Sequence, residues 1–307
     1  MVALLLAGCA GHGGKGGETP GAAKPAVDAD PYALLPPAAV AIVRVDARAA
    51  FTNPTLGASL GAIADSLVPL GDDAGLRLSR DLDRVIAASY ATSAGDVAAV
   101  LSGRFDVDKI AHATKTKAGA AVAAEPHGAY TLYHAGRAAW SPLTATTLLA
   151  GSPEGVRDAL DRIARGPLDR WEPAWMTATL ETPTATAAAV GDFASRPLAA
   201  AALGAIQLPW VAALHQVRAL GTLKPDALDV SGTLTYGDAA QAQQAEESIR
   251  KSVRMLDVLG MVLGGLRLQG FDTKLDAQDV HCSFVLEAPA LRALLDLAPR
   301  FLSSMEP

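Results

Sequence analysis

Cysteine, aromatic residues and positive charge are all scarce in this sequence of 307 residues. Aromatic side chains make up 5% of the chain and hydrophobic residues 50%, so we expect a core of small and branched aliphatic side chains. The 26 lysines and arginines are outnumbered by 32 aspartates and glutamates, which gives a net charge of -6. Affinity for nucleic acid depends on clustered basic residues, and the sequence has no such cluster. We therefore exclude nucleic acid as a partner.

The two cysteines, Cys9 and Cys282, have unlike settings, and neither belongs to a Cys-x-x-Cys pair. The histidines of the body are scattered without the i, i+4 spacing of a zinc site; they are His112, His127, His134, His215 and His281. We therefore predict no metal and no cofactor. Cys282 lies in an apolar, strand-like run, which favours a buried and unreactive thiol over a nucleophile.

Long apolar runs are few, and the most prominent is the uncharged stretch of residues 197–217. It is long enough to cross a bilayer. However, Gln207 and His215 lie inside it, and Pro209 would interrupt a helix. We reject a transmembrane span and expect two short helices buried in the body. The alternative is a surface element that touches lipid or covers an apolar groove.

Motifs of catalysis are present only without their required context. The segment Gly57–Gly61 has the spacing of a nucleophile elbow around Ser59, but the residues before it do not read as a strand, so we expect a helix start. Carboxylates cluster near Asp72, Asp81, Asp106 and Asp272 without the spacing of a calcium loop. We interpret these clusters as solvated turns and helix caps. An extracytoplasmic hydrolase that uses Ser59 remains the least favoured alternative.

The N-terminus carries the most specific signal. Residues 1–8 form a short apolar run, and Leu6-Ala7-Gly8-Cys9 resembles the lipobox of bacterial lipoprotein signal peptides. The resemblance implies that Cys9 receives diacylglycerol and becomes the mature N-terminus, held to a membrane outside the cytoplasm. No Lys or Arg precedes the run, and it is shorter than the usual signal, which indicates a truncated start.

Residues 9–32 read as the lipidated cysteine followed by a flexible tether. The segment from Gly11 to Asp30 is rich in Gly, Ala, Pro and Lys and has no apolar periodicity. Its glycine string has no strand before it and no helix after it, so it does not indicate a phosphate-binding loop. Because Ala10 rather than an acidic residue follows Cys9, we expect transport to the outer membrane, facing the periplasm or the cell surface.

The folded body is expected to begin near residue 33, and its first half alternates strands with helices. The predicted strands are 40–46, 84–92, 96–105, 130–134 and 138–151, and the predicted helices are 56–70, 106–116 and 153–164. Ser152 before Pro153 is a typical helix start.

The second half repeats this order. Its predicted strands are 184–190, 228–237, 266–274 and 280–286, with helices that begin at Asp238 and Pro289. Asp192 follows its strand as Asp46 follows the first one, 146 residues earlier (192 − 46). We predict two divergent repeats, 33–166 and 167–307, in an α+β fold of antiparallel strands with helices on one face. This body loosely resembles exported bacterial domain families of unknown function.

Together these patterns predict a membrane-tethered extracytoplasmic lipoprotein without catalytic activity. Its body would bind a protein partner in the cell envelope or form part of an envelope assembly. The alternative is a carrier of lipid or another apolar ligand, which requires an apolar cavity of at least ~300 Å³.

Overall fold

The computed structural model describes residues 27–90, 96–194, 209–211, 213–262, 268–293 and 295, with the backbone alone for 256–262. The predicted signal segment, Cys9 and most of the predicted tether lie outside the described residues. Most of the uncharged stretch 197–217 lies outside them as well.

Strands and helices alternate along the described chain. The strands are β1 Ala41–Asp46, β2 Leu82–Ser89, β3 Val97–Gly103, β4 Ala123–His127, β5 Tyr130–Ala135, β6 Ala138–Pro142, β7 Thr147–Gly151, β8 Ala187–Asp192, β9 Leu214–Leu223, β10 Ala227–Tyr236, β11 Gln269–Asp276 and β12 Asp279–Glu287. The helices are α1 Ala47–Phe51, α2 Gly57–Leu67, α3 Leu78–Asp81, α4 Val107–His112, α5 Pro153–Arg165, α6 Ala174–Leu180 and α7 Ala239–Val262. Residues 288–293 are also helical.

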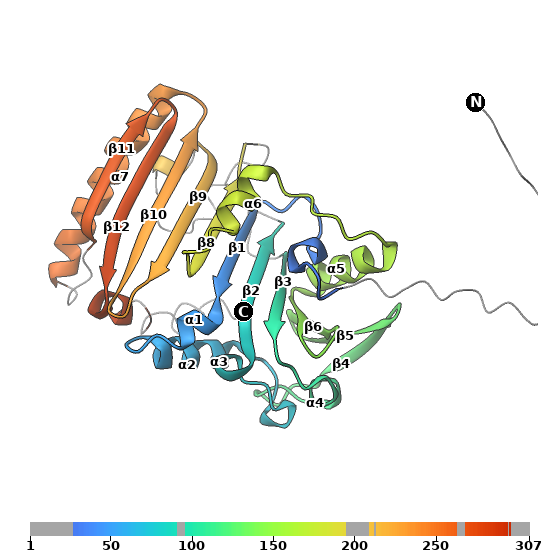
Figure 1. The fold of residues 1–307 in the computed structure, drawn as a ribbon. Coiled ribbons are helices and arrows are strands. Elements are labelled where there is room, and N and C mark those ends of the chain that lie inside the picture. The colour runs from blue at the N-terminus through green and yellow to red at the C-terminus, as the bar shows by residue number, and fades with distance from the viewer. Residues whose placement is uncertain are drawn as a thin grey trace, which may run out of the picture.

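The strands form one twelve-stranded sheet in the order β11-β12-β10-β9-β8-β1-β2-β3-β7-β6-β5-β4 (Figure 1). All neighbouring strands are antiparallel. The predicted α+β class with an antiparallel sheet is therefore confirmed. β1 and β8 lie next to each other at the centre, where Val43 is opposite Ala189.

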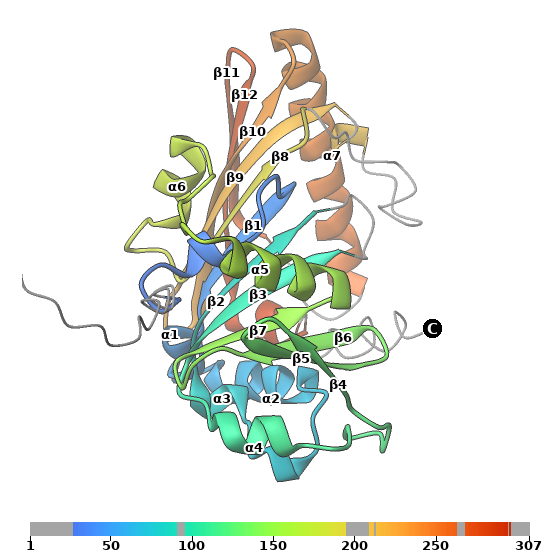
Figure 2. The same ribbon diagram turned by 90° about the vertical axis from the view of Figure 1, so that its right-hand side faces the viewer.

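Helices cover both faces of the sheet, so the prediction of helices on one face is wrong. Val100 and Leu101 are neighbours in β3, which places them on opposite faces, and both are buried. Val100 packs in the cluster that includes α5 residues, while Leu101 packs with Ile110 of α4. Figure 2 shows α5 lying across β3 and β7. We call the side of α5 and α6 the α5 face, and the side of α1–α4 and α7 the α7 face.

Local capping explains where several helices begin. Ser152 accepts a hydrogen bond from the backbone N–H of Gly155 at 3.0 Å, and Pro153 is the first residue of α5, as predicted. Asp106 and Asp238 accept hydrogen bonds from backbone N–H groups three residues further on and cap α4 and α7 in the same way. These short-range signals are readable in the sequence because both partners lie within one turn.

Two other expectations need correction. Residues 138–151 form two strands, β6 and β7, because a turn at 143–146 lets them pair with each other. Residues 214–217 begin β9 and do not end a helix, since β9 pairs with β8 on one side and β10 on the other. Strands β4 and β9 and helices α1, α3 and α6 were not predicted. No helix among the described residues is long and apolar enough to span a membrane.

The close approach of β3 to the chain before β2 depends on Gly103. A Cβ atom at this position would lie 2.0 Å from the carbonyl oxygen of Asp81, whereas one at Gly221 in β9 would lie 3.4 Å from a Leu228 methyl group. We expect Gly103→Ala to lower the free energy of unfolding by about 1–3 kcal/mol, because the backbone has to shift. Gly221→Ala, the matched control, should change it by no more than about 0.5 kcal/mol. Equal urea midpoints for the two variants would contradict this packing.

Candidate ligand-binding site

Helix α7 presents one apolar face to the sheet. Ala242, Ala245, Ile249 and Val253 recur at intervals of three and four residues, which aligns them along one side of a helix. All four are buried, and they pack with Leu214, Tyr236 and Val280 of the sheet. Such spacing is typical of a helix with one buried face, although it does not show which strands lie beneath that face.

A cavity of about 340 Å³ lies between α7 and strands β9, β10 and β12. Most of its lining side chains are apolar: Trp210, Val217, Ala219, Val230, Leu234, Ile249, Val253, Leu268, Phe271, Cys282 and Phe284. Space remains because the floor of the cavity includes Ala219 and Gly232, which place little or no side chain between the sheet and the helix. The volume lies within the ~300–1,000 Å³ range of small-molecule sites.

Cys282 contributes its thiol to the lining of this cavity. Burial raises the pKa of the Cys282 thiol to about 11. The thiol is therefore protonated at neutral pH and acts as a small apolar lining group. This agrees with the expectation of an unreactive cysteine.

A polar clasp ties α7 to the edge strand β11. The Glu246 carboxylate accepts hydrogen bonds from Arg250 Nη2 at 2.9 Å and from Thr273 Oγ1 at 2.8 Å. Arg250 Nη2 also donates to the backbone carbonyl of Thr273 at 2.9 Å. The hydrogen bonds from Thr273 and Arg250 hold the pKa of Glu246 below its usual value. The sequence did not reveal this clasp, because Glu246 and Arg250 read as an ordinary surface pair.

A second, polar hollow of about 650 Å³ lies on the α5 face of β9, β10 and β12, beside α6. Thr233 Oγ1 and His281 Nδ1 lie 3.0 Å apart in it. The two residues are cross-strand partners of β10 and β12, so the sheet register alone brings them together. The Thr233 hydroxyl would act as a nucleophile only if His281 took its proton and a third group oriented the histidine ring. Among the described residues, no carboxylate contacts the His281 ring.

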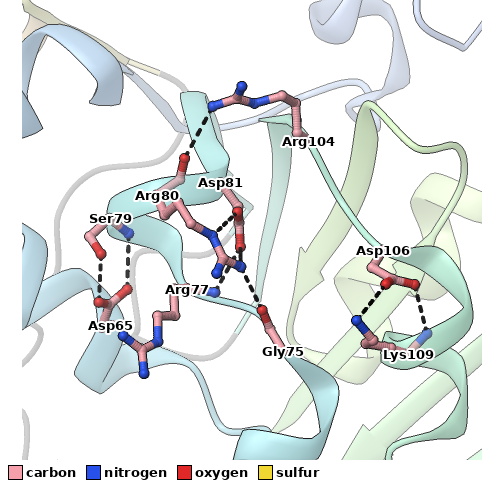
Figure 3. Close-up of polar contacts among 9 residues, drawn as sticks. All are labelled: Asp65, Gly75, Arg77, Ser79, Arg80, Asp81, Arg104, Asp106 and Lys109. Atoms are coloured by element: carbon pink, nitrogen blue, oxygen red, sulfur yellow. Dashed lines mark hydrogen bonds and ion pairs between the residues drawn. The ribbon is translucent and has the colours of Figure 1, made fainter.

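Figure 3 shows two of the carboxylate clusters noted in the sequence, those around Asp81 and Asp106, in a turn, a helix cap and ion pairs. Asp81 accepts from Arg80 Nε at 2.6 Å and from the backbone N–H of Arg77 at 2.9 Å. Burial alone would raise the pKa of Asp81, but the hydrogen bonds from Arg80 and Arg77 outweigh it and lower the pKa. Asp106 caps α4 and pairs with Lys109 Nζ at 3.0 Å. These contacts fit the predicted role of turns and caps.

The remaining sequence candidates are dispersed. Ser59 is exposed inside α2, so it does not lie on a sharp turn between a strand and a helix. His127 Nε2 contacts Asp161 at 2.7 Å, and His112 Nδ1 contacts the carbonyl oxygen of Asp108 at 2.6 Å. Within the described ranges, no three metal-binding side chains gather in one place. His112 and His127 are thus hydrogen-bonded side chains.

The body is therefore an α+β protein with one antiparallel sheet and an apolar cavity beneath its longest described helix. No protein-family model matches the chain, and no curated protein matches it in sequence. Solved structures of TP0453 are similar in fold. Crystal form I has a TM-score of 0.55 at 13% identity, covering 87% of this chain and 97% of that one. Crystal form IV has a TM-score of 0.53 at 12% identity, covering 87% and 96%.

The α7 clasp generates a pH-dependent prediction. Because the pKa of Glu246 is lowered in the folded state, its contribution to stability is present above the unfolded-state pKa and is lost as the pH falls through the folded-state value. We expect Glu246→Gln to cost about 1–3 kcal/mol at neutral pH and progressively less in acid. Urea unfolding at several pH values measures this. The exposed neighbour Glu247, changed to Gln, is the control, and an equal pH-independent loss in both variants would contradict the clasp.

Proposed function

We propose that this chain is a non-enzymatic binding module, held to a bacterial membrane outside the cytoplasm by lipid on Cys9. Support for the anchor comes from the lipobox resemblance of Leu6-Ala7-Gly8-Cys9 and from the Gly- and Ala-rich segment that follows it. Ala10 favours the outer membrane as the destination. The proposed partners are the membrane itself and a protein of the cell envelope, and no cofactor is assigned.

The apolar cavity favours one version of this function, the carrier of lipid or another apolar ligand. Its volume of about 340 Å³ meets the requirement for a carrier, and a solid core beneath α7 would have excluded it. Burying an apolar group there removes about 25 cal/mol of unfavourable hydration per Å² of apolar surface. The large exposed apolar side chains Val43, Leu67, Met255 and Leu275 come from four different elements, which gives less support to a docking patch for a protein.

We also propose that the two halves are divergent repeats of one ancestral unit. Outward from the centre, the first half runs β1, β2, β3, β7, β6 and the second runs β8, β9, β10, β12, β11. The central pair Val43 and Ala189 is separated by the same 146 residues (189 − 43) as Asp46 and Asp192. Superposing the five strands of one half on those of the other tests this proposal. Matching strand directions and order support it, and a mismatch in either contradicts it.

The anchor is tested in cells that express the gene from its native start. An alkyne fatty acid should label wild-type protein and fail to label Cys9→Ala, because lipid attachment requires the thiol of that residue. Cys282→Ala, which removes the other cysteine, is the matched control and should label like wild type. Equal labelling of wild type and Cys9→Ala, or unlabelled wild type that fractionates as soluble protein, would show that the lipoprotein proposal is wrong.

The cavity is tested with the apolar fluorophore N-phenyl-1-naphthylamine. We expect saturable binding to wild type and at least a tenfold weaker affinity in Val230→Phe, because the added ring occupies the cavity. Val43→Phe, a strand valine that does not line the cavity, should bind as wild type does. Absence of saturable binding to wild type, or equal affinity in both variants, would remove the carrier proposal.

A further inference from the structure

A third hollow, of about 450 Å³, lies on the α5 face near the first described residues of the chain. Its walls come from residues 29–32 on one side and from the end of α6 and the residues after it on the other. Strands β1 and β2 supply the floor through Arg44, Asp46 and Arg84. Neither the apolar cavity nor the proposed anchor accounts for its polar lining.

Arg44 is a buried cation without a carboxylate partner. The residue is only 7% exposed, and its Nη2 donates to the carbonyl oxygens of Ala185 at 2.7 Å and Thr182 at 3.3 Å. Its Nε is buried without a hydrogen-bond partner. Both acceptors are neutral, so the guanidinium charge is not compensated by them. A buried guanidinium that forms no ion pair is costly, and an anion from outside the chain can pair with it here.

Arg84 adds a second guanidinium to the same floor. It is opposite Asp46 in the pairing of β1 with β2, and it is exposed. Within the described part of the chain, Arg84 makes no side-chain hydrogen bond or ion pair. The Asp46 carboxylate accepts instead from the backbone N–H of Ala49 at 3.0 Å, where it caps α1. Arg84 is therefore available to a ligand.

The acids of the wall form ion pairs with a third arginine. Arg170 pairs with Asp30 and, at 2.6 Å, with Glu181. The guanidinium of Arg170 also lies 4.7 Å from the centre of the Tyr32 ring. The Tyr32 hydroxyl is buried and has no hydrogen-bond partner. Among the described residues, the hollow thus combines two guanidinium groups that form no ion pair with an unpartnered hydroxyl donor.

We propose that this hollow binds the carboxylate or phosphate group of a small molecule, with Arg44 and Arg84 as its charged ligands and Tyr32 as a further donor. Guanidinium groups suit this role because their planar N–H groups match the oxygens of carboxylates and phosphates. Arg44 also has a structural role, because its Nη2 contacts hold the chain between α6 and β8 against β1. That structural role does not explain why Arg84, which forms no ion pair among the described residues, lies in the same hollow.

Isothermal titration calorimetry of the full chain with inorganic phosphate, at constant ionic strength, tests the proposal. We expect saturable binding to wild type and at least a tenfold weaker affinity in Arg84→Gln, a change that breaks no contact within the described chain. Arg137→Gln removes the same charge from an exposed turn and should bind phosphate as wild type does. Arg44→Lys keeps the buried charge but loses the planar fork, so it should also bind more weakly.

Acetate and glycerol 3-phosphate, used as alternative titrants, distinguish the source of the anion. Tighter binding of acetate assigns the hollow to a carboxylate, and tighter binding of glycerol 3-phosphate assigns it to a phosphate ester such as a lipid headgroup. Failure of all three titrants to bind wild type, or equal binding by wild type and Arg84→Gln, overturns the proposal. These outcomes are independent of fluorophore binding in the α7 cavity.

Discussion

The pairing of β1 with β8 is the contact on which the rest of the molecule depends. These strands join the two halves of the chain into one sheet, with Val43 opposite Ala189 at the centre. Arg44 strengthens this junction by donating to carbonyl groups just before β8. Asn53 Nδ2 adds a hydrogen bond to the carbonyl oxygen of Lys224 at 2.7 Å across the same junction. Without the pairing of β1 with β8, neither the α5-face core nor the hollow around Arg44 would be complete.

The two halves use their sheet faces differently, and the difference places the candidate sites. In the first half both faces are covered, so neighbouring residues such as Val100 and Leu101 are both buried. In the second half α7 covers one face of β9, β10 and β12. Along β10, apolar Val230 and Leu234 line the cavity beneath α7, and polar Ser231 and Thr233 line the hollow on the α5 face. Small residues beneath α7 leave an apolar cavity on one side, while the other side carries a polar hollow. The candidate ligand sites therefore lie where the packing is incomplete.

The sequence predicted those features whose partners lie close together in the chain. The start of α5, with Ser152 and Pro153, follows from one turn of backbone geometry. The predicted strands 130–134 and 138–151 leave a short gap, and the chain turns there between β5 and β6. The α+β class followed from the alternation of short strands and helices.

Features that depend on distant partners were not readable. Alanine-rich residues before Leu214 resemble a helix, yet β9 is fixed by strands on both sides of it. The apolar run from Val97 to Leu101 does indicate burial on both faces, a signal that the prediction of one helical layer overlooked. Arg44 looks like an exposed strand residue, because its carbonyl partners are about 140 residues away. The clasp between Glu246 and Thr273 is hidden for the same reason.

Hydrogen–deuterium exchange in low urea tests the central claim that the two halves form one cooperative sheet. Amides in residues 41–46 and 187–192 should exchange only through global unfolding, at the same rate as those in residues 97–103. Faster exchange confined to residues 41–46 and 187–192 would mean that the halves separate before they unfold. That result would contradict an account in which the β1–β8 pairing holds the molecule together.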